Sequence, residues 1–295
     1  MGRSRIRVVA VLLVLAGAAG GCSGSSNGSA GSDGSASAVD AEPESFALAL
    51  GVDADDPDAR EPLGAYDLVV VDGAETSAAS VRALQDEGAS VLAYLSVGTV
   101  EPGRSWFDAA RDGGWLLDHW DDWDEWYAAV DQRGMRELLL DEARTELAKG
   151  FDGLFLDNTD MVAEHPQQRA GMVRLVADLD DLVAGRVLFA QNGDPVAAGI
   201  VDHLDGWNRE DVSSTYDFDA EAYAAVSDQD HRAALASLAD LRRRGLTVTA
   251  TDYTDGTDPA EDDRWAEAAC AAGGLPFVAD IDLSRIAEPP RTCER

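Results

Sequence analysis

Eight short apolar runs alternate along the chain with longer segments of helical periodicity, and this alternation restricts the possible folds more than any other feature. The runs are rich in β-branched residues and are bounded by Gly, Asp and Asn, which is typical of buried strands. They cover residues 46–50, 67–71, 91–95, 153–156, 187–191, 204–207, 247–251 and 277–281. Amphipathic helices are predicted for residues 77–87, 135–149, 168–182 and 230–244. This α/β repeat predicts a single (β/α)8 barrel, the TIM-barrel fold.

A doubly wound open sheet is the competing architecture. Its nucleotide-binding form requires a glycine-rich turn after the first strand, whereas residues 51–58 read GVDADDPD. No phosphate-binding turn is therefore predicted, and the barrel is favoured.

The N-terminal region is typical of a bacterial lipoprotein. Arginines precede an apolar run at residues 8–19, which is short for a membrane span, and small residues lead into Cys22. We expect residues 1–21 to be a signal peptide and Cys22 to be acylated, with ordinary secretion as the alternative. The Ser/Gly-rich residues 22–45 are predicted to be a flexible tether. The barrel is then expected over residues 46–288, with a tail at 289–295, outside the cytoplasm and anchored to the cell membrane.

The charge balance bears on binding partners. The sequence has 23 basic and 56 acidic residues, a net charge of -33, which disfavours nucleic acid and would attract a cationic substrate. A general compositional bias is the competing explanation, since Lys149 is the only lysine. Cys270 and Cys293 are expected to form a disulfide, because disulfides persist outside the cytoplasm. The histidines show no paired ligand spacing, so no metal site and no cofactor are predicted.

In a (β/α)8 barrel the active site lies at the carboxyl ends of the strands, and here those ends are acidic or polar. They carry Asp72, Ser96, Asp157, Asn192, Glu210, Asp252 and residues 280–282. One strand-end aspartate is often only a turn or cap residue, but several on one rim indicate carboxylate chemistry. Two carboxylates suffice to hydrolyse a glycosidic bond, and Asp157 and Glu210 are the predicted pair. A retaining enzyme needs a separation of about 5 to 5.5 Å between them, and an inverting enzyme about 6.5 to 9.5 Å.

Tryptophans are concentrated in the long connection between the third and fourth predicted strands. They are Trp106, Trp115, Trp120, Trp123 and Trp126. Aromatic faces stack on the apolar faces of sugar rings, so this connection could form one wall of a glycan groove, with Trp120 as a substrate-binding candidate. Packing inside the insertion is the alternative role for some of them.

Several segments together resemble glycoside hydrolase family 114. They are YDLVVVDGA (66–74), VLAYLSVGTVEPGRSWF (91–107), KGFDGLFLDNTD (149–160), NRED (208–211) and VTATDYTD (248–255). The resemblance extends over nearly all of residues 46–286. It implies a TIM-barrel endo-α-1,4-polygalactosaminidase that cleaves galactosamine-containing exopolysaccharide by a retaining mechanism.

The resemblance also implies roles for individual residues. Asp157 corresponds to the nucleophile and Glu210 to the acid/base. Four residues correspond to the lining of the sugar pocket: Asp72, Tyr94, Asn192 and Asp252. The first strand and the SVGTVE segment depart from the family pattern, so another amino sugar or another α-linked glycan is an alternative substrate. A monomer acting on an extracellular amino-sugar polysaccharide is expected. A noncatalytic polysaccharide-binding barrel and a metal-assisted hydrolase are the competing classes.

Overall fold

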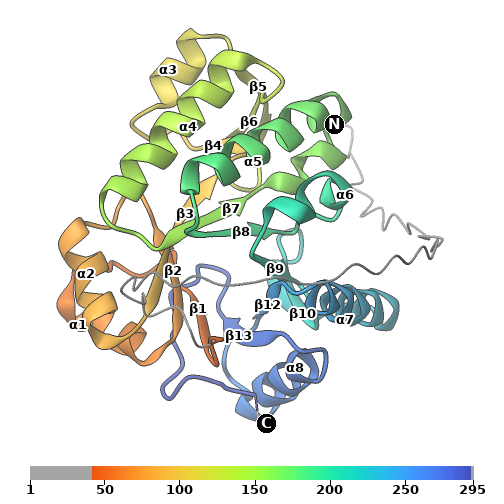
Figure 1. Ribbon diagram of the computed structural model, residues 1–295. Helices are drawn as coiled ribbons and strands as arrows, with labels where there is room; N and C mark the ends of the chain where they lie inside the picture. Colours follow the sequence, from red (N-terminus) through yellow and green to blue (C-terminus); the bar gives the residue numbers. More distant parts are fainter. Residues whose placement is uncertain (1–41, 294–295) are drawn as a thin grey trace, which may run out of the picture. The chain divides into compact units, whose positions relative to one another are not determined.

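The computed structural model describes residues 42–293 and contains the predicted barrel (Figure 1). Eight parallel strands are hydrogen-bonded in the order β1-β2-β3-β7-β8-β9-β12-β13. They are β1 (Phe46–Leu48), β2 (Leu68–Asp72), β3 (Ser90–Ser96), β7 (Gly153–Asp157), β8 (Val187–Gln191), β9 (Gly206–Glu210), β12 (Thr247–Tyr253) and β13 (Leu275–Ala279). The first and last strands contact each other, and the rings of Phe46 and Phe277 meet edge to face at 6.0 Å between centroids. The predicted (β/α)8 fold is confirmed, and each predicted run overlaps one strand.

The N-terminal predictions fall on a part of the chain that the structure does not describe. The signal peptide, Cys22 and residues 22–41 of the predicted tether all lie outside the described residues. Within residues 42–293, no helix has the length and apolar character needed to cross a bilayer.

Helices surround the strands, and α4 and α5 pack side by side (Figure 1). The α-helices are α1 (Pro57–Arg60), α2 (Ala78–Glu87), α3 (Phe107–Asp112), α4 (Arg133–Ala148), α5 (Arg169–Val183), α6 (Ala197–Ile200), α7 (Asp228–Arg243) and α8 (Pro259–Ala271). Short 3-10 segments are η1 (Glu61–Ala65), η2 (Thr159–Ala163), η3 (Pro166–Gln168) and η4 (Val201–His203). Ser77 caps α2, which ends at Gly88 in the left-handed region that glycine tolerates. The predicted helices correspond to α2, α4, α5 and α7.

Three aspartates tie neighbouring strands together at the amino-terminal end of the barrel. Asp67 precedes β2 and accepts hydrogen bonds from the backbone N–H groups of residues 44 and 45, which lead into β1. Asp152 precedes β7 and accepts from the N–H of Val91 in β3 at 2.8 Å. Asp205 precedes β9 and accepts from the N–H of Leu188 in β8 at 2.9 Å. We call this arrangement an aspartate clip: an aspartate before one strand accepts a hydrogen bond from the backbone at the start of its neighbour. Such clips join β1 to β2, β3 to β7, and β8 to β9.

Two β insertions extend the opposite, carboxyl-terminal end. After β3, the strands β4 (Thr99–Val100), β5 (Leu116–Trp120) and β6 (Glu125–Ala128) form a small antiparallel sheet in the order β4-β6-β5. After β9, the strands β10 (Ser214–Asp217) and β11 (Ala222–Ala225) form an antiparallel hairpin. We predicted no strands in either segment from the sequence.

Cys270 and Cys293 form a disulfide in the structure. It joins α8 to the C-terminal segment, where Arg291 also contacts Asp262 and Asp263. These contacts hold the end of the described chain against the helical layer.

Candidate active site

Asp157 ends β7 and is the most heavily hydrogen-bonded carboxylate at the mouth of the barrel. Its Oδ2 accepts a hydrogen bond from the Tyr94 hydroxyl of β3 at 2.6 Å. Its Oδ1 accepts from the backbone N–H of Asn158 at 2.6 Å and from Nε2 of Gln191 at 3.0 Å. Burial raises the pKa of Asp157, while these three donors act in the opposite direction because they stabilise the anion.

Glu210 ends β9, two strands further round the barrel. Its Oε2 accepts from Nδ2 of Asn192 at 2.7 Å, and its backbone N–H donates to Oδ1 of the same residue at 3.0 Å. Its Oε1 accepts from the Tyr253 hydroxyl. Burial, followed by the negative charges of Asp157 and Asp211, raises the pKa of Glu210 to about 8. The predicted carboxylates are thus electrostatic neighbours with different surroundings.

A buried chain of polar side chains supports Asp157 from inside the barrel. Gln191, which donates to Asp157, accepts a hydrogen bond from Nδ2 of Asn208 at 2.7 Å. Oδ1 of Asn208 accepts from the hydroxyls of Thr249 at 2.7 Å and Thr251 at 3.2 Å. These donor directions are consistent with one another, so the threonines orient Asn208, Asn208 orients Gln191, and Gln191 presents its N–H to the carboxylate.

Sequence reasoning missed this supporting chain, although a signal for it exists. Thr249, Thr251 and Tyr253 alternate along β12, so they share the face that points into the barrel. Polar residues repeated at that spacing on an inward face are unusual in a core, and they require partners. Asn208 and Glu210 have the same relation on β9.

Asp72, a predicted pocket residue, lies in an ion pair. Arg104 donates from Nη1 and Nη2 to its two carboxylate oxygens at 2.9 and 2.7 Å, and it also contacts Glu101 at 2.5 Å. Only 11% of the Arg104 side chain and 14% of the Asp72 side chain are exposed. This pair joins the end of β2 to the insertion that follows β3.

Asp252, another predicted pocket residue, is buried behind the hairpin that follows β9. Its Oδ1 accepts from the backbone N–H groups of Ser213 at 2.5 Å and Ser214 at 2.9 Å. Burial, opposed by these hydrogen bonds, raises its pKa to about 6. Asp252 therefore fixes the base of the β10–β11 hairpin.

The tryptophan-rich insertion divides between packing and exposure. Trp106 is buried, and Trp115 packs tightly over Gly113 and Gly134, where an added Cβ would collide with its ring. Trp120 stacks on Tyr127 at 5.6 Å between centroids. Among the described tryptophans, only Trp123 is well exposed.

Further carboxylates near the pair were not predicted. Glu125 on β6 has an Oε2 that is buried without a hydrogen-bond partner. Burial, and then the charges of Glu101 and Asp157, raise the pKa of Glu125 to about 7. Burial and the charge of Asp157 likewise raise the pKa of Asp160 to about 7. The mouth is thus rich in carboxylates that repel one another.

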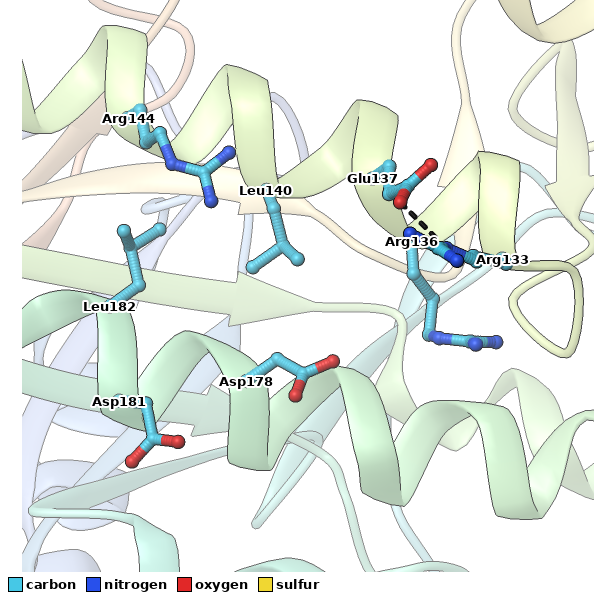
Figure 2. A pocket seen from close by; sticks show the side chains of 8 residues that line it. All are labelled: Arg133, Arg136, Glu137, Leu140, Arg144, Asp178, Asp181 and Leu182. Carbon is cyan, nitrogen blue, oxygen red and sulfur yellow. Dashed lines mark hydrogen bonds and ion pairs between the residues drawn. The ribbon is translucent and has the colours of Figure 1, made fainter.

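The described residues 42–293 contain no group of three or more His, Cys, Asp or Glu side chains arranged to hold a metal ion. A separate groove lies between α4 and α5 and is lined by both charge types (Figure 2). Its charged residues include Arg133, Arg136, Arg144, Asp178 and Asp181. The groove belongs to the outer helical layer and receives no residue from the strand ends.

The chain is similar to known proteins over most of its length. The model of glycoside-hydrolase family GH114 matches residues 29–293. An uncharacterized protein of Deinococcus radiodurans is 31% identical over 242 residues, 75% of either chain. The glycoside hydrolase domain of PelA from Pseudomonas aeruginosa superposes with a TM-score of 0.68 at 25% identity, covering 83% of this chain and 97% of that one. Ega3 of Aspergillus fumigatus, solved in complex with galactosamine, superposes with a TM-score of 0.66 at 17% identity, covering 82% of this chain and 93% of that one.

Proposed function

The chain belongs to glycoside-hydrolase family GH114, and on this premise we propose that it cleaves α-1,4-linked galactosamine polymers internally, with retention of anomeric configuration. The observation that carries the proposal is the unequal environment of Asp157 and Glu210. Asp157 has three close donors that favour its anion. At Glu210, burial and the charges of Asp157 and Asp211 favour the protonated form and outweigh the hydrogen bonds from Asn192 and Tyr253. Two neighbouring carboxyl groups with different preferences of this kind are what a nucleophile and an acid require.

In the first step, Asp157 attacks the anomeric carbon while Glu210 protonates the departing glycosidic oxygen. The C–O bond to the leaving group breaks, and a glycosyl ester forms on Asp157. Tyr94 and Gln191 hold the attacking carboxylate in place, and Asn192 and Tyr253 hold Glu210.

In the second step, Glu210 is an anion and acts as the base. It removes a proton from water, which attacks the anomeric carbon and releases the sugar from Asp157. Glu210 ends with its proton restored, and Asp157 ends as the carboxylate. The pair therefore regains its starting state without a cofactor.

The substrate proposal is supported by charge and by similarity. Glu125 and Asp160 add carboxylates to the mouth beside the pair, and a polymer bearing ammonium groups would relieve their repulsion. The net charge of -33 would also draw such a polymer from a distance. Ega3, which shares the fold, was solved with galactosamine.

We also propose that the enzyme works as a monomer outside the cytoplasm, attached to the membrane through an acylated Cys22. The basis is the sequence pattern of residues 1–22. Its partner in that setting is extracellular amino-sugar polysaccharide.

The test is release of reducing ends from α-1,4-galactosamine polymer, both acetylated and deacetylated, by the full chain. Asp157→Asn should reduce hydrolysis to background, and Glu210→Gln should lower it by about 10²–10⁴-fold. Asp178→Asn, in the groove between α4 and α5, is the control for a lost surface charge. Proton NMR of the first product should show the α-anomer.

Cleavage by the parent but not by the two active-site variants, with an α-product, supports the whole proposal. A β-product would overturn retention and leave the hydrolase. Absence of cleavage of either polymer, with cleavage of another α-linked glycan, would overturn the substrate.

A further inference from the structure

Two exposed aromatic side chains meet at the mouth of the barrel. Trp123 and Phe218 are 43% and 40% exposed, and no other large apolar side chain among the described residues is as open. Their rings meet edge to face, with centroids 5.2 Å apart and planes at 70°. An edge-to-face contact leaves ring faces uncovered, so the pair offers apolar surface to a ligand.

The positions of the two residues place this contact over the catalytic strands. Trp123 lies in the insertion that follows β3, and Phe218 lies at the tip of the hairpin that follows β9. Between β3 and β9 the sheet contains β7 and β8, which end at Asp157 and Gln191. A contact between the insertion after β3 and the hairpin after β9 therefore bridges the carboxyl ends of β7 and β8, where Asp157 lies.

The structure holds both rings in place. His119 contacts Asp121 at 2.8 Å and Asp124 at 3.0 Å, which closes the turn that presents Trp123. On the other side, the Phe218 ring packs on Tyr216 at 5.1 Å. The hairpin below it is anchored by Asp252, as described above. The exposed pair is thus a supported surface.

Acidic residues flank both aromatic residues in the sequence. Trp123 lies in the sequence DDWDE (121–125) and Phe218 in DFDAE (217–221), and neither stretch contains a basic residue. The aspartates in both stretches are exposed. A flat ring flanked by carboxylates complements a hexosamine unit, whose apolar face can stack while its ammonium group pairs with the anions or with the π-face.

We propose that Trp123 and Phe218, with Asp122 and Asp219, form a second sugar-binding site that holds a cationic hexosamine unit away from the scissile bond. The proposal rests on the proposed function, because the occupant is the same polymer that is cleaved between Asp157 and Glu210. Binding at this site lowers KM for chains long enough to reach it and contributes nothing to short substrates.

The first experiment compares deacetylated α-1,4-galactosamine polymer with a 4-nitrophenyl galactosaminide. Trp123→Ala and Phe218→Ala should each lower the ratio of kcat/KM for polymer to kcat/KM for the aryl glycoside by about ten-fold, mainly through KM. Trp123→Phe should restore most of the ratio, since it keeps a flat apolar ring. An equal fall for both substrates would overturn the proposal, because it would indicate structural damage.

The second experiment separates local contact from overall charge. Asp122→Asn with Asp219→Asn should raise KM several-fold for deacetylated polymer and much less for acetylated polymer. Asp178→Asn with Asp181→Asn removes the same charge from the groove between α4 and α5 (Figure 2) and is the matched control. Equal effects of the two double variants would overturn the site and assign the attraction to long-range charge.

Binding measured without turnover distinguishes this proposal from the proposed function. In an Asp157→Asn background, Trp123→Ala should raise Kd for deacetylated polymer about ten-fold. This result, together with a parent enzyme that cleaves no galactosamine polymer, would overturn the proposed function and support the site. A parent that cleaves the polymer, with a Kd that Trp123→Ala does not change, would overturn the site alone.

Discussion

Replacing Tyr94 by phenylalanine deletes one hydroxyl that donates to Asp157, and we expect kcat/KM to fall about 10- to 150-fold. The hydroxyl lies 2.6 Å from Oδ2, and the other donor to that oxygen, Nδ2 of Asn158, is at 3.3 Å. A hydrogen bond to a charged group contributes about 1.5–3 kcal/mol, which corresponds to that range of rates. The ring itself remains to fill the core.

The same substitution should change the pH profile in one direction. The Tyr94 hydroxyl lowers the pKa of Asp157 because it stabilises the anion, so its loss raises that pKa. Asp157 must be ionised to attack, so the acidic limb of kcat/KM should move to higher pH. Tyr253→Phe deletes the equivalent donor to Glu210 and raises the pKa of the group that must be protonated, so the alkaline limb should move instead.

The two variants control for each other because both remove one buried hydroxyl. The assay is kcat/KM against pH on deacetylated galactosamine polymer, with urea denaturation to verify folding. A fall of less than about three-fold for Tyr94→Phe, or the same limb moving in both variants, would refute the assignment of nucleophile and acid.

Three further predictions concern stability. Because burial and nearby carboxylates raise the pKa of Glu125 from 4.5 to about 7, its contribution is complete below pH 4.5 and is lost as the pH rises through 7. We compare the free energy of unfolding of Glu125→Gln with that of the parent at two pH values. The difference in favour of the variant should be larger at pH 8 than at pH 4.5, by up to about 3 kcal/mol. Arg104→Gln should lower the free energy of unfolding, measured by urea denaturation, by about 3–5 kcal/mol, because Asp72 is left buried without its partner. Replacing Cys270 and Cys293 by serine should cost about 3 kcal/mol under oxidising conditions, since the bond closes a loop of 23 residues.

Each stability prediction has its own contradicting result. If Glu125→Gln changes the free energy of unfolding equally at both pH values, the pKa of Glu125 does not differ between the folded and unfolded states, which contradicts the prediction. Arg133→Gln breaks an exposed ion pair with Glu137 and should cost at most about 1 kcal/mol, so equal losses for the two arginines would contradict the argument from burial. Unchanged urea midpoints for the serine variant would show that the C-terminal segment does not need the disulfide.

Strand positions and strand ends were predictable because both follow from local pattern. The apolar run GLFLD ends at its only carboxylate, so period and polarity place Asp157 at the mouth of a parallel barrel without tertiary information. Helix α8 was missed because its alanine-rich sequence gives weak contrast between its faces. The strands within the two insertions were missed because they are short and pair only with one another.

The side chains that contact each site residue were less predictable from the sequence than the position of that residue at a strand end. Asp72 and Asp252 end their strands as expected, yet whether such a carboxylate faces substrate or Arg104 depends on insertions whose folding is not encoded locally. The Gln191–Asn208 link likewise joins residues 17 apart in sequence across neighbouring strands. Only the register between those strands brings them together.

The aspartate side chains at the amino-terminal end link six of the eight barrel strands in three pairs. The clips join β1 with β2 through Asp67, β3 with β7 through Asp152, and β8 with β9 through Asp205. Helix α5 connects β7 to β8, and no clip links those two strands. A chain divided there would give two half-barrels, each keeping its own clips intact. Asp157 would belong to one half and Glu210 to the other, so neither half alone would hold a complete catalytic pair. Hydrolysis would then report directly on reassembly of the halves.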